Sequence, residues 1–334
     1  MRAASAALLL IAGCTCKGEP EQTKSVDPAT LEPSNGSAMA GSGSGGGGGG
    51  SAAGSGWFSH YGPRDVHEFE DDPDAVVGQR GRHVALIVTS DEVEITPART
   101  LRLETRTCRD KFNACPNVPY AWQETVGHCS AIAVANDMVL TARHCLTLTA
   151  QGKIPRDTYY AIFGYRLARG ELPTNQVAAG EWHQLTAVVA KSNTLSDWIL
   201  VRVAPAIQSS HLGALVVDSE PVSSNVYALG HPLGLPLKVA GGVVRRVQKG
   251  SIWTNLDSYP GNSGGPVFLK SSHRFVGMVS AGLPGLVPRG PCNDDVEGPE
   301  DAGPGTRVLP VAHFLAALTE HAKWPPVVEQ GAIQ

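Results

Sequence analysis

The sequence lacks an excess of charge of either sign, because 27 Lys and Arg stand against 31 Asp and Glu, a formal net charge of -4 at pH 7. A domain-wide basic surface for nucleic acid is therefore not expected. Long hydrophobic runs are also missing. The longest candidate, residues 3–13, falls short of the roughly eighteen apolar residues of a spanning helix, which excludes a multi-pass membrane protein. The 7 Cys and 11 His form no Cys-x-x-Cys or HExxH pattern, so we expect no metal and no cofactor.

What is present at the N-terminus is typical of a targeting segment. Arg2 supplies a positive charge, residues 6–11 an apolar core, and Ala12 and Gly13 small residues at which a peptidase could cut. The string Leu-Ile-Ala-Gly-Cys, which ends at Cys14, resembles the bacterial lipobox. That resemblance implies a signal peptide over residues 1–13 and lipidation of Cys14. The alternatives are an ordinary signal peptide followed by a chance cysteine, and the start of a buried helix.

The lipobox resemblance also implies a location. The protein would be an exported bacterial protein, held to the cell envelope by a lipid anchor at Cys14, or otherwise secreted. Thr15 in place of aspartate points to the outer membrane.

Residues 14–62 are expected to form a disordered tether. They are rich in Pro, Glu, Ser, Ala and Gly, include the run GSGSGGGGGGSAAGSG, and show no hydrophobic periodicity. Such a segment cannot bury enough apolar surface to offset the entropy lost on ordering. Residues 63–334 remain for a folded domain.

The folded part reads as an all-β protein. Short apolar and β-branched runs separated by Gly, Pro, Asn and Asp predict strands over residues 83–89, 130–134, 138–141, 198–203, 224–229, 239–247, 266–269 and 275–280. Helical spacing occurs once, where Val311, Phe314, Leu315 and Leu318 follow Pro310. Many strands, no βα alternation and one terminal helix favour barrels or a sandwich.

Six cysteines remain after Cys14, in a chain expected to leave the cytoplasm, so disulfides are permitted. Cys129 and Cys145 flank two predicted strands that a hairpin would bring side by side, which predicts a bridge between them. Cys108 and Cys115 could close a second loop. Cys16 and Cys292 have no obvious partner.

Three short strings carry residues suited to nucleophilic catalysis. They are Thr-Ala-Arg-His-Cys ending at Cys145, Asp-Trp-Ile-Leu-Val starting at Asp197, and Gly-Asn-Ser-Gly-Gly-Pro starting at Gly261. A lone histidine, aspartate or glycine-rich serine turn is usually structural. Together, histidine, aspartate and serine follow one another in the chain order of the chymotrypsin arrangement.

Residues from about 84 to 324 resemble the trypsin-like, chymotrypsin-fold serine peptidases, in particular the secreted bacterial branch that includes glutamyl endopeptidases. The strings just quoted carry the resemblance, with Gly-His-Cys-Ser ending at Ser130 and Gly-His-Pro-Leu-Gly-Leu-Pro starting at Gly230. It implies two packed six-stranded antiparallel β-barrels with a C-terminal helix, and a peptidase domain over residues 63–334.

The resemblance also assigns roles. Ser263 would be the nucleophile, His144 the general base and then acid, and Asp197 the group that orients the imidazole. The backbone N–H groups of Gly261 and Ser263 would form the oxyanion hole. Ser280 and Gly282 match the strand that pairs with the substrate backbone, with Ser280 in contact with the aspartate. An ordinary strand serine is the other interpretation of Ser280.

Specificity is predicted from Asp257, six residues before Ser263, where trypsin carries the carboxylate of its specificity pocket. A carboxylate there would bind Arg or Lys before the cleaved bond. The alternative is a carboxylate that braces its own loop. Glutamyl specificity is not favoured, because Val279 stands where glutamyl endopeptidases carry a histidine.

The function predicted from the sequence is therefore a serine endopeptidase acting on protein or peptide substrates, in a monomer. Two alternatives stay open: a catalytically silent, surface-tethered binding protein that keeps the peptidase fold, and an esterase that uses the same three residues.

Overall fold

The computed structural model describes residues 58–167, 175–192, 196–212, 222–303 and 305–322. The predicted signal peptide, Cys14, Cys16 and most of the predicted tether lie outside these residues. The tether prediction extended too far, because Ser59, His60 and Tyr61 are buried and His60–Tyr61 forms strand β1, which pairs with β21 (Glu297–Gly298). In the described part of the chain, no helix is long and apolar enough to cross a membrane.

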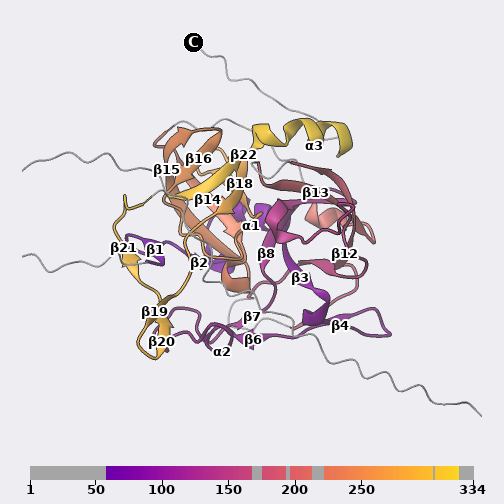
Figure 1. Ribbon diagram of the computed structural model, residues 1–334, viewed down its shortest axis with the longest axis horizontal. Helices are drawn as coiled ribbons and strands as arrows, with labels where there is room; N and C mark the ends of the chain where they lie inside the picture. Colours follow the sequence, from indigo (N-terminus) through magenta and orange to yellow (C-terminus); the bar gives the residue numbers. More distant parts are fainter. Residues whose placement is uncertain (1–57, 168–174, 193–195, 213–221, 304, 323–334) are drawn as a thin grey trace, which may run out of the picture. The chain divides into compact units, whose positions relative to one another are not determined.

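Six strands of the N-terminal half form a closed antiparallel barrel (Figure 1, purple to magenta). Around the barrel they follow the order β10-β12-β13-β9-β8-β3. Their bounds are β3 Val84–Thr89, β8 Cys129–Ala135, β9 Met138–Ala142, β10 Tyr159–Phe163, β12 Trp182–Lys191 and β13 Trp198–Ala204. Their β-branched and aromatic residues suit pleated, buried positions, and β9 and β10 are buried along their whole length.

The second barrel is built by the C-terminal half in the order β14-β17-β18-β22-β16-β15, and pairing of β14 with β15 closes it. The strands are β14 Asn225–Gly230, β15 Lys238–Gln248, β16 Ser251–Thr254, β17 Pro266–Leu269, β18 Phe275–Ala281 and β22 Thr306–Pro310. A short strand, β2 (His67–Glu68), adds to the outside of β15. The two six-stranded barrels expected from the sequence are thus confirmed.

One hydrophobic cluster spans the two barrels, and each barrel has a further cluster of its own. Buried residues of β3, β8 and β9 pack in the same cluster as Tyr227, Leu229 and Phe268 of the second barrel. The C-terminal helix α3 (Leu315–His321) is present as predicted. Phe314, just before α3, lies edge-on to Trp198 of β13 and near Phe275 of β18, so this end of the chain packs against both barrels.

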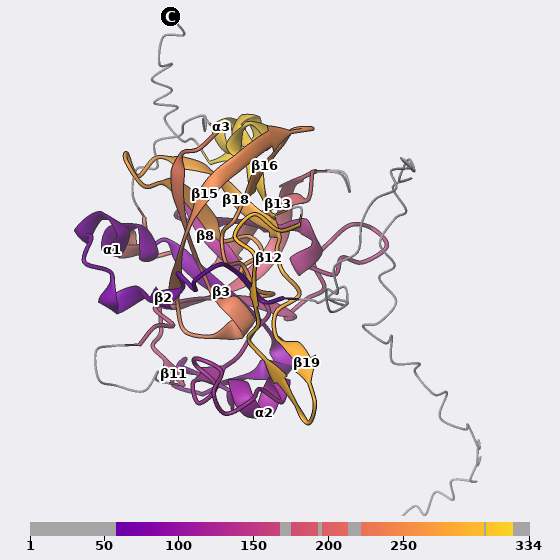
Figure 2. The same cartoon turned by 90° about the vertical axis from the view of Figure 1, so that its left-hand side faces the viewer.

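Smaller elements surround the barrels. They are helices α1 (Ala75–Gly81) and α2 (Cys108–Phe112), with strands β4 Val93–Ile95, β5 Leu101–Leu103, β6 Arg106–Thr107, β7 Glu124–Thr125, β11 Gln176–Val177, β19 Val287–Arg289 and β20 Cys292–Asp294. In Figures 1 and 2, α2 lies beside the β19–β20 hairpin. The amide of Cys115 donates to the carbonyl of Asn293 at 2.8 Å, which joins these two segments.

The disulfides correct one sequence-based prediction. Cys129 is bonded to Cys145, but Cys115 is bonded to Cys292, so the predicted Cys108–Cys115 bridge is wrong. Cys108 begins α2 with its side chain fully buried and is a free thiol, whose pKa burial raises to about 11. The helix holds Cys108 in the interior, whereas Cys115 follows Asn113, a left-handed helix end that turns the chain toward β20.

Peptide mapping without reduction should therefore recover a peptide pair linked through Cys115 and Cys292, together with unmodified Cys108. Cys108 should react with an alkylating reagent only after unfolding, because its side chain is buried. Recovery of a peptide linked through Cys108 and Cys115 would contradict this pairing.

Candidate active site

His144 lies in a tight turn at the rim of the first barrel. Strand β9 ends at Ala142, and the 3₁₀ turn Arg143–Cys145 presents the histidine with 49% of its side chain exposed. The Cys129–Cys145 disulfide ties the end of this turn to the start of β8. The turn is therefore fixed at one end by the strand and at the other by a covalent bond.

Asp197 is placed beside His144 by the pairing of two strands. Trp198, the first residue of β13, pairs with Ala142, the last residue of β9, so the residues just outside this pair are neighbours. The carboxylate accepts from the imidazole Nδ1 at 2.8 Å and from the backbone N–H of His144 at 3.0 Å. Asp197 has a φ of 44°, a left-handed conformation that aspartate tolerates better than most residues.

A third donor reaches the same carboxylate from the second barrel. The Ser280 hydroxyl donates to Asp197 Oδ2 at 2.8 Å. Burial raises the pKa of Asp197, but the hydrogen bond and charge of His144 and the hydroxyl of Ser280 outweigh it, and the pKa lies below its usual value. Asp197 is therefore an anion at neutral pH, and it holds Nδ1 of His144 protonated, which leaves Nε2 free to accept a proton.

Ser263 lies in the loop between β16 and β17, and its backbone contacts the first barrel. Its carbonyl oxygen accepts from the backbone N–H of Ser130 at 2.8 Å and lies 3.8 Å from Cys145 Sγ. His144 contacts the same disulfide, because a ring nitrogen of His144 and the sulfurs of Cys129 and Cys145 all lie within 4.8 Å of one another. The His144 ring and the Ser263 backbone thus approach the same disulfide, and Asp197 contacts His144.

The described hydrogen bonds do not include one between the His144 ring and the Ser263 hydroxyl. This bond is often long in peptidases without substrate and tightens when substrate binds.

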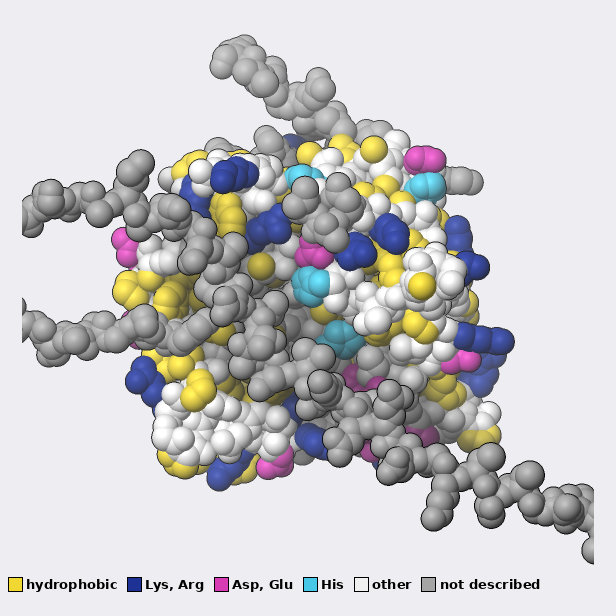
Figure 3. Space-filling model, in the orientation of Figure 1, with side chains coloured by type: hydrophobic (Ala, Val, Ile, Leu, Met, Phe, Trp, Pro, Cys, Tyr) yellow, Lys and Arg dark blue, Asp and Glu magenta, His cyan; other side chains and the backbone are white. Residues whose placement is uncertain are grey.

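Figure 3 shows histidine side chains reaching the surface near the middle of the face drawn there, beside acidic and basic side chains.

Two backbone N–H groups, those of Gly261 and of Ser263 itself, lie close to the Ser263 side chain in sequence. The Pro260 carbonyl accepts from the Leu233 amide at 2.5 Å, so the N–H of Gly261, at the other end of the same planar peptide, is directed away from Leu233. Among the described residues, neither the Gly261 N–H nor the Ser263 N–H donates a hydrogen bond. Such a pair of backbone donors beside a serine hydroxyl can stabilise an oxyanion.

Only glycine fits at position 261. Its φ is 100°, and an added Cβ would lie 2.3 Å from the carbonyl oxygen of His231. Ser130 fixes the same loop, since its buried hydroxyl donates to the Gly261 carbonyl at 2.8 Å and accepts from the His231 amide at 2.9 Å. The role of Ser130 was not predicted. The available signal was its place directly after Cys129.

Asp257 lies in the interior behind its own loop. It is 1% exposed, and its two oxygens accept from the backbone N–H groups of Tyr61 at 2.8 Å and Asp65 at 3.2 Å. These contacts favour the alternative of a bracing carboxylate over recognition of Arg or Lys through Asp257. The sequence could not reveal these contacts, because Tyr61 lies 196 residues and Asp65 lies 192 residues upstream, on either side of the predicted end of the tether.

Asp65 and Asp257 form a pair of adjoining carboxyl groups, of which Asp257 is buried and Asp65 is exposed. Burial raises the pKa of Asp257, and partial desolvation together with the charge of Asp257 raises the pKa of Asp65 to about 8. Two adjoining carboxyl groups, one of them buried, cannot both ionise readily, so they hold one proton between them near neutral pH.

Asp65→Asn should therefore change how stability depends on pH. Below about pH 4 the carboxyl is protonated in the folded and unfolded states alike. Between there and pH 8 only the folded state keeps the proton, so the wild-type free energy of unfolding declines as the pH rises. The variant should lose this decline and melt at a higher temperature than wild type at pH 8. Equal melting temperatures for the two proteins at both pH 5 and pH 8 would contradict the shared proton.

The one candidate metal cluster in the described residues is that of Cys129, His144 and Cys145. Its two sulfurs are joined to each other, so they are not thiolate ligands. The cluster is the disulfide beside the histidine and not a metal centre.

Comparison with known proteins locates the family likeness over the same residues. Residues 129–278 match the family model of the trypsin-like peptidase domain. This range contains His144, Asp197 and Ser263. No curated protein matches the chain.

Two solved structures illustrate the structural likeness. A kallikrein-related peptidase 10 complex with Zn²⁺ shares 16% identity and a TM-score of 0.41, over 58% of this chain and 89% of that one. A serine endoprotease from Yersinia pestis shares 12% identity and a TM-score of 0.41, over 73% of this chain and 65% of that one. The chain thus spans just under two thirds of the second protein. Likeness at this level carries no argument about activity.

Proposed function

We propose that this chain is a serine endopeptidase that hydrolyses peptide bonds through Ser263, His144 and Asp197. The observation that carries the proposal is the 2.8 Å contact between His144 Nδ1 and Asp197, on the same disulfide-bonded turn that the Ser263 backbone approaches, together with the N–H groups of Gly261 and Ser263, which have no acceptor among the described residues. The trypsin-like family match over the same residues supports it.

In this mechanism the Ser263 hydroxyl attacks the substrate carbonyl carbon as its proton passes to His144 Nε2. Asp197 stabilises the imidazolium that forms. The negative charge on the carbonyl oxygen is held by the N–H groups of Gly261 and Ser263. His144 then protonates the leaving amine, which leaves an acyl group on Ser263. Water, activated by His144, hydrolyses this ester and restores the enzyme.

Labelling with a fluorophosphonate tests the proposal. The reagent should modify wild-type protein at Ser263, as located by peptide mapping, and should leave the Ser263→Ala variant unlabelled. Absence of labelling in correctly folded wild type would favour the silent binding protein instead. Labelling with hydrolysis of simple esters and of no peptide would favour the esterase.

The proposal includes a location, which rests on residues 10–14 alone and lies outside the described structure. We propose that the enzyme is exported and lipid-anchored at Cys14, where it would meet protein substrates at the cell envelope.

A further inference from the structure

Two segments that flank Ser263 lie in direct contact with each other. The first is the loop of residues 257–260 before the nucleophile, and the second is residues 280–283 at the end of β18. The Leu283 amide donates to the Ser258 carbonyl at 2.9 Å. A Cβ placed on Gly282 would lie 2.3 Å from that carbonyl oxygen, so the two backbones meet with no gap for a side chain.

The contact between the segments extends beyond this hydrogen bond. The Cβ position of Gly282 is also 2.8 Å from the Ser258 hydroxyl, and that of Gly285 is 3.1 Å from the Pro260 ring. The Ser258 hydroxyl is buried and has no hydrogen-bond partner among the described residues.

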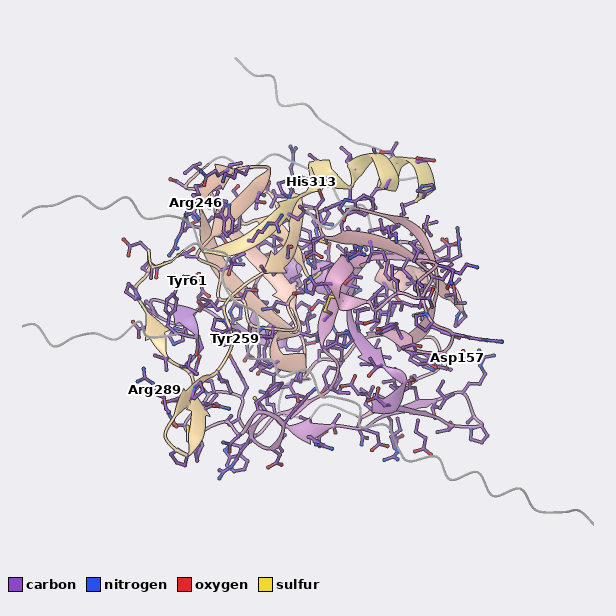
Figure 4. All side chains as sticks on the ribbon, in the orientation of Figure 1. Tyr61, Asp157, Arg246, Tyr259, Arg289 and His313 are labelled. Atoms are coloured by element: carbon purple, nitrogen blue, oxygen red, sulfur yellow. A yellow bond between two sulfur atoms is a disulfide. The ribbon has the colours of Figure 1, made fainter. Side chains whose placement is uncertain are left out.

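The loop of residues 257–260 is also held from its other side. Asp257 accepts the backbone N–H groups of Tyr61 and Asp65, and the Tyr259 hydroxyl donates to Asp295 at 2.9 Å. Arg64 donates to the same Asp295 through Nε at 2.8 Å. Figure 4 labels Tyr61 and Tyr259, which lie on the half of the view that holds the second barrel. These contacts brace the loop in its place against residues 280–283.

We propose that the contact between Ser258 and Gly282 restricts this enzyme to bonds preceded by glycine or alanine. The inference rests on the proposed function. We place the substrate backbone along residues 280–282, with the carbonyl of the bond to be cleaved at Ser263. The side chain of the residue that carries this carbonyl is then directed toward the contact between the two segments. The hydrogen atom of a glycine or the methyl group of an alanine fits at the edge of that contact. A larger side chain has to break the Leu283–Ser258 hydrogen bond and displace a braced loop.

The direct test is a series of otherwise identical peptides with Gly, Ala, Val, Leu, Phe, Glu or Arg before the cleaved bond. We expect kcat/KM for Gly and Ala to exceed the values for Leu, Phe and Arg by at least about tenfold, the lower end of what exclusion by size achieves for one methylene. A value for Leu, Phe or Arg less than about tenfold below those for Gly and Ala would overturn the inference.

A matched pair of variants tests the role of the hydrogen bond. Leu283→Pro removes the N–H that joins the segments, whereas Leu283→Ala shortens the side chain and keeps the N–H. We expect Leu283→Pro to raise cleavage after leucine relative to glycine and Leu283→Ala to leave this ratio as in wild type. A Leu283→Pro protein that labels with fluorophosphonate but keeps the wild-type ratio would count against the inference. Should this variant fail to fold, the wild-type peptide series decides.

Failure of the inference and failure of the proposed function are distinguishable. Wild-type protein that neither labels with fluorophosphonate nor cleaves any peptide contradicts the proposed function. Protein that labels and cleaves after large residues contradicts only the inference. Protein that labels and cleaves no member of the series also overturns the inference, because the segments would then exclude glycine as well.

Discussion

Replacing His144 by alanine is expected to lower kcat for peptide hydrolysis by about 10⁶-fold, with little change in KM, because the triad acts as a unit and loses nearly all of its effect with one member. The residual rate would come from the backbone donors at Gly261 and Ser263 and from substrate binding. Steady-state kinetics on a peptide cleaved by the wild type provides the measurement, and an unchanged melting temperature shows that the fold is intact.

His128 offers a matched control for this prediction. It lies one residue before Cys129 and contacts the same disulfide-bonded turn, with its ring Nε2 at 3.0 Å from the carbonyl of Cys145. It makes no contact with Asp197 among the described hydrogen bonds. His128→Ala should therefore lower kcat by less than about tenfold, through loss of one hydrogen bond. A loss below about 100-fold for His144→Ala, less than a single general base usually contributes, would contradict the catalytic assignment.

The barrels were predictable because local sequence and architecture agree. Runs such as Val84–Thr89 and Trp198–Ala204 carry β-branched and apolar residues along their length, and both form strands close to the predicted bounds. Strands β10, β12, β16 and β22 were not predicted. The strand β12 illustrates the reason, since residues 185–191 alternate poorly between apolar and polar and include two shifts of register against β13.

Two long-range contacts were beyond the sequence for a different reason. The Cys115–Cys292 bridge spans 177 residues, and Asp257 is satisfied by backbone groups of Tyr61 and Asp65. No local pattern marks Cys292 as the partner of Cys115. None marks Tyr61 and Asp65 as the partners of Asp257, because a backbone N–H is available at almost every residue. A motif can therefore locate Asp257 at a position without revealing whether its carboxylate faces substrate or a neighbouring loop.

The site also shows how one residue type can serve two purposes in one fold. The Asp197 carboxylate, with 16% of its side chain exposed, accepts hydrogen bonds from His144 and Ser280, which stabilise its anion, whereas Asp257 is buried against a second carboxyl group. The pKa of the first is lowered by His144 and Ser280, and that of the second is raised by burial. Environment, and not sequence position, separates a group that acts on the imidazole from one that holds a loop.

Asp197→Asn should lower kcat by about 10⁴-fold while the geometry of the site is kept, because an amide in this place can stabilise the wrong tautomer of His144. The carboxylate now accepts from three donors: the Nδ1 and backbone N–H of His144 and the Ser280 hydroxyl. An asparagine has one acceptor oxygen in place of two. When that oxygen accepts the backbone N–H of His144, the amide NH₂ group faces Nδ1 of the imidazole. Nδ1 is then favoured as an acceptor, so the proton moves to Nε2 and blocks the nitrogen that must take it from Ser263.

Ser280→Ala provides the matched control, since it removes one donor to the same oxygen without changing the charge of Asp197. It should lower kcat by about three- to tenfold, the loss of one hydrogen bond of ordinary strength. The carboxylate itself separates the two variants. Because Ser280 helps to lower the pKa of Asp197, its loss should raise that pKa in a titration of the Asp197 carboxylate followed by NMR, whereas the Asp197→Asn enzyme has no carboxylate there. Equal rate losses in the two variants would show that Asp197 acts only by position and not through its charge.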